Sequence, residues 1–168
     1  AGVVAYDQGD EPLGEARLFN FGITNFKRPN YIVDFLGGRV DFYGHERPYP
    51  MYLGRWTRYD RAVTRYPLNL PPAAAKALLL RMRDRVSPAN MHYRYDTFRE
   101  NCATRIRDLL DTATGGAVHA TLAGQATGRS FRDDVRRAYA GEPALLLLTE
   151  IFPGPTLDAP RDAWAMAY

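Results

Sequence analysis

A chain of 168 residues, 46% of them hydrophobic and 24% charged, has the composition of one globular domain and excludes a disordered or fibrous protein. The net charge is only +3 and the arginines are spread along the chain, which argues against a nucleic-acid partner, because such a partner needs a clustered basic stripe. One cysteine excludes an internal disulfide, and the longest apolar run, Ala144 to Leu148, is far too short to span a bilayer.

The first seventy residues have the alternating, aromatic-rich pattern of β-strands. In the second expected strand, Ala16, Leu18 and Asn20 share one face, and Phe19 and Phe21 share the other. A short helix is expected at 31–36, a polar turn at 7–10 and a proline-punctuated loop at 44–50. The expected strands are 3–6, 16–22, 39–43, 51–59 and 62–68.

Helical patterns begin near Pro71. A first helix over 73–86 opens with Pro71-Pro72 and carries a core stripe of Leu78, Leu79, Met82 and Val86. A second helix is expected over 101–112, closed by Gly115-Gly116, and a third from the capping box of Ser130 and Asp133 to about Ala140. A small-residue loop over 121–128 separates these two, and the tail from Pro153 is expected to be irregular. The switch in pattern predicts an α+β domain in which the second helix packs on an antiparallel sheet built largely from residues 1–70.

The second helix begins with the chain's single cysteine. Asn101 is a good N-cap, and this places Cys102 at the first helical position, facing free N–H groups and the positive end of the helix dipole. Both features favour a thiolate, the nucleophilic form of cysteine. Cys102 also shares a helical stripe with Ile106 and Leu109, so its thiol is expected to point toward the sheet. Spacing alone equally allows a buried, inert cysteine that fills a gap between helix and sheet.

The histidines give this thiol no evident base. His45, His92 and His119 show neither the spacing of metal ligands nor a visible pairing with Cys102, and one cysteine argues against a zinc site. Each histidine is therefore interpreted as a surface or partly buried residue without a catalytic role. No metal and no cofactor are expected.

Five segments carry a resemblance to a known family. The most specific is Tyr95-Asp96-Thr97-Phe98-Arg99-Glu100-Asn101-Cys102-Ala103-Thr104-Arg105-Ile106-Arg107-Asp108, and together the segments resemble the Lnb N-terminal periplasmic domain family over nearly the whole chain. The other segments, in order, are 19–26, 35–43, 60–64 with 68–70, and 158–168 with Trp164.

The resemblance implies a permuted papain-like (NlpC-type) domain in the periplasm or cell envelope, membrane-anchored through parts outside this chain. It is similar to lipoprotein N-acyltransferases, which move an acyl chain from a phospholipid to a lipoprotein amino terminus through a thioester. Cys102 would then be the nucleophile, with its own N–H in an oxyanion hole. Asn20 would orient a base histidine, although a turn-stabilising amide explains it as well. Tyr95, Asn101 and Arg105 would bind substrate.

The same resemblance places a Phe-Gly-His element, with the base histidine, just upstream of Val3. The single domain over 1–168 is therefore expected to be incomplete at its N-terminus and at its C-terminus. His45 has a Tyr-Gly-His context but follows the matched Gly38-Arg39 strand, so the role is not transferred to it. Two alternatives stay open: a cysteine peptidase or amidase acting on cell-wall peptide, and a non-catalytic envelope binding domain with a structural cysteine.

Overall fold

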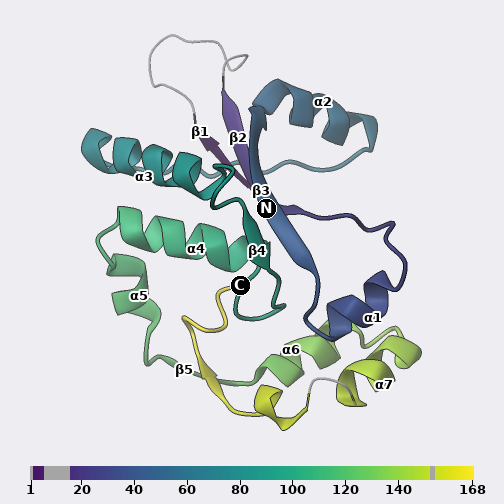
Figure 1. The fold of residues 1–168 in the computed structure, drawn as a ribbon. Coiled ribbons are helices and arrows are strands. Elements are labelled where there is room, and N and C mark those ends of the chain that lie inside the picture. Colours follow the sequence, from purple (N-terminus) through teal and green to yellow (C-terminus); the bar gives the residue numbers. More distant parts are fainter. Residues whose placement is uncertain (1, 6–15, 152–153) are drawn as a thin grey trace.

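The computed structural model describes the backbone of residues 2–5 and the chain over residues 16–151 and 154–168. The architecture is α+β: in these ranges, seven helices accompany a four-stranded antiparallel sheet and a separate two-stranded one (Figure 1). The predicted class and the antiparallel sheet are thus confirmed. None of the helices in the described ranges is both long and apolar enough to cross a bilayer.

The main sheet has its strands in chain order, so each strand pairs with the next one along the sequence. Its register places Gly2 opposite Asn20 and Asn20 opposite His45. An irregularity between Asn20 and Ile23 interrupts the pairing of the second strand, in the manner of a β-bulge. The strands are β1 (Gly2–Ala5), β2 (Arg17–Ile23), β3 (Asp41–Pro48) and β4 (His92–Arg94).

The helices bury both faces of β2. On one face, Phe19 and Phe21 form the largest core with Leu78, Met82 and Leu109. The last three belong to α3 and α4, which lie side by side in Figure 1. On the other face, α2 covers Ala16 and Leu18. The helices are α1 (Tyr31–Leu36), α2 (Tyr49–Arg58), α3 (Pro72–Arg85), α4 (Cys102–Ala113), α5 (Ala117–Leu122), α6 (Phe131–Ala138) and α7 (Pro143–Ile151).

Two of the expected strands are wrong. Residues 51–59 belong mostly to α2, because Tyr49, Tyr52 and Trp56 stand three and four residues apart and pack together on Ala16 and Leu18. A segment rich in aromatic residues is typical of a strand, but the spacing of these aromatic residues is that of a helix. Residues 62–68 form neither helix nor strand and are exposed throughout, so no sheet partner or core contact orders them as a strand.

Smaller differences concern segments that were expected to be loops. β3 continues through 44–48, and 121–128 contains the end of α5 and most of β5 (Ala126–Arg129). The tail adds a 3-10 turn at Pro155–Leu157 and β6 (Arg161–Asp162), which pairs with β5. β4, α5 and α7 were not expected. The turn at 7–10 lies outside the described residues.

Candidate functional site

Cys102 is held in place by the cap of α4. The Asn101 Oδ1 atom accepts hydrogen bonds from the N–H groups of Ala103 (2.7 Å) and Thr104 (3.0 Å), and the Thr104 hydroxyl accepts one from the Asn101 N–H (2.8 Å). This reciprocal capping box uses the neighbouring N–H groups and leaves that of Cys102 without an acceptor among the described residues. The first helical position therefore carries a thiol beside a free backbone donor.

The turn before the helix is equally fixed. The Asp96 carboxylate accepts bonds from the N–H groups of Phe98 (2.9 Å) and Arg99 (2.8 Å), and Asp96 pairs through its backbone with Glu100. The Asn101 side chain also donates to the Thr97 carbonyl (2.7 Å). Asn101 is almost fully buried, at 4% exposure. Its side-chain polar atoms therefore bond to the turn and to the helix start and are not available to solvent.

Across from the thiol lies Gly22, in the irregular part of β2. A Cβ atom built on Gly22 would stand 3.6 Å from the Cys102 Cβ, 3.7 Å from its Sγ and 3.5 Å from the Asn20 Oδ1. The Cys102 thiol and the Asn20 amide thus flank the same point of the strand. The Asn20 Oδ1 accepts a bond from the Gly22 N–H (2.9 Å), which fixes the amide there and also makes it the turn-stabilising group that the sequence allowed.

A polar chain leads from Asn20 to His45. The Asn20 Nδ2 donates to the Tyr52 hydroxyl (3.4 Å), and that hydroxyl is hydrogen-bonded to the His45 Nε2. His45 stands on β3 directly opposite Asn20 rather than in a loop. Partial burial, and then the nearby Arg47, lower the pKa of His45, so the imidazole is neutral at neutral pH.

Sequence reasoning missed this chain because it ended the strand at Tyr43. In the structure β3 continues to Pro48, with Phe42 and Gly44 buried and Tyr43 and His45 partly exposed, and sequence alone did not reveal this continuation.

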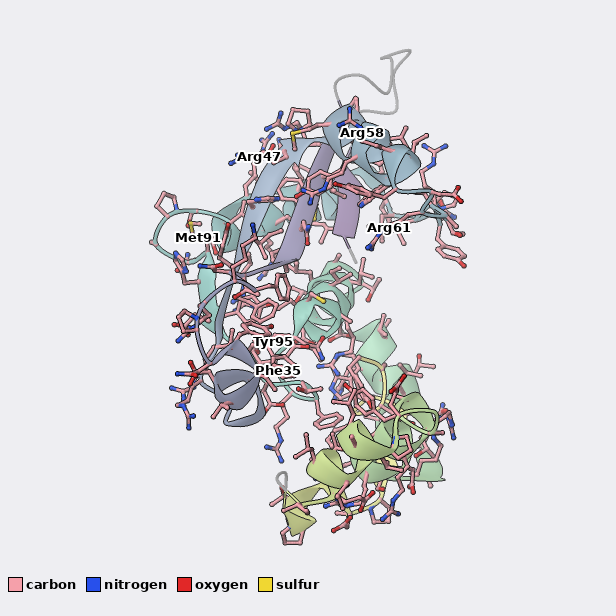
Figure 2. All side chains as sticks on the ribbon, turned by 90° about the vertical axis from the view of Figure 1, so that its right-hand side faces the viewer. Phe35, Arg47, Arg58, Arg61, Met91 and Tyr95 are labelled. Carbon is pink, nitrogen blue, oxygen red and sulfur yellow. The ribbon has the colours of Figure 1, made fainter. Side chains whose placement is uncertain are left out.

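Two tyrosines complete the surroundings of the thiol. Burial, and next the charge of Cys102, raise the pKa of Tyr93 far above its ordinary value; the same two causes raise the pKa of Tyr95 to about 12. Both phenols therefore stay protonated at neutral pH. Both lie near enough to the sulfur for its charge to raise their pKa values. The Tyr93 hydroxyl donates to the Phe21 carbonyl (2.6 Å). Tyr95 stacks on Phe42. It also lies beside Phe35, and Figure 2 shows these two residues close together.

Arg105 is anchored inside this neighbourhood. Its guanidinium lies 3.8 Å from the centre of the Tyr93 ring, and its Nε donates to a Glu100 carboxylate oxygen at 2.7 Å. Its side chain is only 12% exposed. The structure thus places Asn101 and Tyr95 near Cys102, whereas Arg105 lies against Tyr93, and Asn101 and Arg105 are both engaged with protein groups.

The other two histidines lie elsewhere. His92 is exposed on β4 beside Tyr43, and His119 is exposed on α5, with its ring 4.8 Å from that of Trp164. Over residues 2–5, 16–151 and 154–168, no three His, Cys, Asp or Glu side chains are grouped so that they could hold a metal ion.

Comparison with known proteins bears on this arrangement. No curated protein and no solved structure matches the chain. The family model described as Lnb N-terminal periplasmic domain matches residues 3–140, which include β2, the Asn101-Cys102 helix start and the capping box of α6. This match covers most of the chain and agrees with the resemblance of the Tyr95–Asp108 segment. The chain belongs to the Lnb N-terminal periplasmic domain family.

Proposed function

We propose that this chain is a thiol-dependent acyl-transfer domain in which Cys102 is the nucleophile. The observation that carries the proposal is the position of the thiol: it stands on the first residue of a capped helix, beside its own free N–H, and faces the Asn20 amide across Gly22. Cys102 also packs against the core around Phe19 and Phe21, but a cysteine that only filled a gap there would not need the Asn20 amide nearby. The antiparallel sheet with a cysteine-bearing helix on it is compatible with a permuted papain-like (NlpC-type) core.

In the proposed reaction the Cys102 sulfur attacks an ester carbonyl of a phospholipid. A tetrahedral oxyanion forms, which the Cys102 N–H is placed to stabilise, because donors at a helix start face developing negative charge. The ester C–O bond breaks, the glycerol oxygen leaves with a proton, and a thioester remains on Cys102. The amino terminus of a lipoprotein then attacks the thioester, an amide forms, and the thiol regains its proton.

Both half-reactions need a base, and the strand register indicates where it would stand. Because Gly2 lies opposite Asn20, each position further upstream on β1 moves one residue further along β2. A position upstream of β1 would therefore lie toward Gly22, the residue that faces the thiol. A histidine there would complete the site, and the Asn20 amide is close enough to orient it. In this proposal the intact protein works in the periplasm, anchored to the membrane by parts outside the chain.

The test compares the chain with a version extended upstream through the expected histidine. Each is incubated with phospholipid that carries a labelled acyl chain, and label bound to protein through a hydroxylamine-sensitive bond is measured. We expect label on Cys102 in the extended protein, none in Cys102→Ser, and about 10²–10⁴-fold less in the version without the histidine. Equal labelling of the two lengths would assign the base to His45, which His45→Gln would then verify. Cleavage of wall peptide without phospholipid labelling would instead support the peptidase or amidase.

A further inference from the structure

The surface on and beside α2 has more arginines than carboxylates. Residues 47–61 contain four arginines and a single carboxylate, Asp60, which is a local excess of three positive charges. Other arginines occur throughout the sequence, but these four lie on and beside α2. We define the α2 surface by its exposed members Arg47, Arg55, Arg58, Arg61, Met51, Leu53 and Tyr59.

These arginines are not used to hold the fold together. None of them takes part in the ion pairs found among the described residues. The acidic neighbour on β3, Glu46, pairs instead with Arg17 at 2.9 Å. Figure 2 shows Arg47, Arg58 and Arg61 around the α2 end of the molecule, away from Phe35 and Tyr95.

A pocket lies within this surface. It has a volume of about 560 Å³, and no carboxylate lines it. Arg55 and Arg58 supply guanidinium groups, and Tyr52 and His45 join the pocket to the polar chain that ends at Asn20 and Gly22, beside Cys102. Guanidinium forks and phenol hydroxyls suit a phosphate group.

The apolar side chains beside the arginines distinguish a lipid bilayer from a nucleic acid as the partner. Met51 is 53% exposed, Leu53 38% and Tyr59 64%, and Met51 and Tyr59 line the pocket. Exposed aliphatic and aromatic groups next to arginines are typical of surfaces that lie in a lipid headgroup layer, where the charges meet phosphates and the apolar groups enter the acyl boundary. A nucleic acid would use the arginines and leave Met51 and Leu53 without a partner.

From this charge complementarity we propose that the α2 surface docks on an anionic phospholipid bilayer, with one headgroup phosphate in the pocket between Arg55 and Arg58. Docking is a property of this chain itself and adds to any anchor elsewhere. Its role in delivering an acyl donor to Cys102 rests on the proposed function, whereas the binding of vesicles does not require a reactive thiol.

The experiment measures co-sedimentation of the 168-residue chain with vesicles of phosphatidylcholine alone or mixed with phosphatidylglycerol. We expect binding to the mixed vesicles only, weakening as salt is raised. Removing two charges in the double variant Arg55→Gln, Arg58→Gln should lower the partition coefficient about 25-fold, at roughly fivefold per arginine. The control is Arg81→Gln, Arg85→Gln, which removes two exposed arginines one turn apart on α3 and should bind as the unaltered chain does.

Three results would overturn the proposal: equal binding to both vesicle types, equal losses in the two double variants, or unchanged binding of Met51→Gln, Leu53→Gln. The last result would assign the surface to a polyanion rather than to a bilayer. Cys102→Ser should bind vesicles normally, so a failure of the acyl-transfer proposal would leave docking intact and remain distinguishable from a failure of docking. Circular dichroism of each variant verifies its fold, since all substituted arginine, methionine and leucine sites are exposed.

Discussion

Asn101 decides where the Cys102 thiol stands, because its side chain bonds to both the turn before α4 and the first turn of the helix. Replacing it with alanine removes three hydrogen bonds and leaves buried N–H groups without acceptors. We expect Asn101→Ala to lower the free energy of unfolding by about 1–2 kcal/mol, measured by chemical denaturation, and to slow alkylation of Cys102.

A matched control exists at the other capped helix. Ser130 caps α6 through the same kind of reciprocal box with Asp133. Ser130→Ala should cost a similar free energy and leave the alkylation rate of Cys102 unchanged. If the two variants alter that rate equally, the cap of α4 has no specific role in placing the thiol.

His45 makes the stability of the sheet depend on pH. Burial, followed by Arg47, lowers its pKa in the folded state, so the unfolded chain binds a proton more readily in mildly acidic solution. The stability contribution is therefore present above the unfolded pKa of about 6.5 and is lost as the pH falls below it. Unfolding free energies measured between about pH 7 and pH 5 should decline, and His45→Gln should flatten that decline. An unchanged slope in the variant would show that other groups cause it.

At the scale of elements, β2 is packed on both faces, and its fit is tightest against β3. A Cβ on Gly44 would stand 2.7 Å from the Cδ1 of Phe21, a core side chain at 0% exposure with no room to move aside. We expect Gly44→Ala to cost about 1–3 kcal/mol in chemical denaturation. Gly54→Ala, on α2 with nothing within 4 Å, should instead stabilise by up to about 1 kcal/mol. A neutral Gly44→Ala would mean that β2 and β3 are packed more loosely than described.

Capping residues and prolines in the sequence correctly predicted where helices begin. Asn101, Ser130 and Pro71-Pro72 each mark a helix start, and the structure begins α4, α6 and α3 there within a residue. The α2 helix escaped prediction because its aromatic content favours a strand, whereas its packing on Ala16 and Leu18 is a tertiary effect.

One part of the candidate site was likewise predicted from local sequence, and the other part was not. Cys102 and its helix start could be predicted from sequence, because an N-cap is a local pattern. The chain of Asn20, Tyr52 and His45 could not, because it depends on the register between β2 and β3 and on α2 lying beside them. Gly2, Asn20 and His45 become neighbours only when β1, β2 and β3 pair.

At the scale of the whole molecule, Arg132 joins the C-terminal segment to the rest. Its side chain is 7% exposed; it pairs with Asp158 and donates to the carbonyls of Gly154 (2.7 Å) and Thr149 (3.2 Å). Arg132→Met leaves these groups without their shared cation, at a cost of roughly 3 kcal/mol. We expect limited proteolysis to cut this variant after α6. Arg136→Met, which removes an exposed arginine paired with Glu150, should stay resistant. Equal resistance of both variants would contradict this role.

The alkylation rate of Cys102 shows whether the fold presents it as a reactive thiol. Iodoacetamide is applied at neutral pH to the folded chain and to the same chain unfolded in guanidinium, and modification of the single cysteine is followed by intact mass. We expect faster alkylation in the folded chain, because the thiol stands at a helix start beside a free N–H. We also expect a slower rate in Gly22→Ala, whose added methyl lies in ordinary contact with the sulfur and the Asn20 amide. Slower alkylation of the folded chain than of the unfolded one would identify Cys102 as a structural residue.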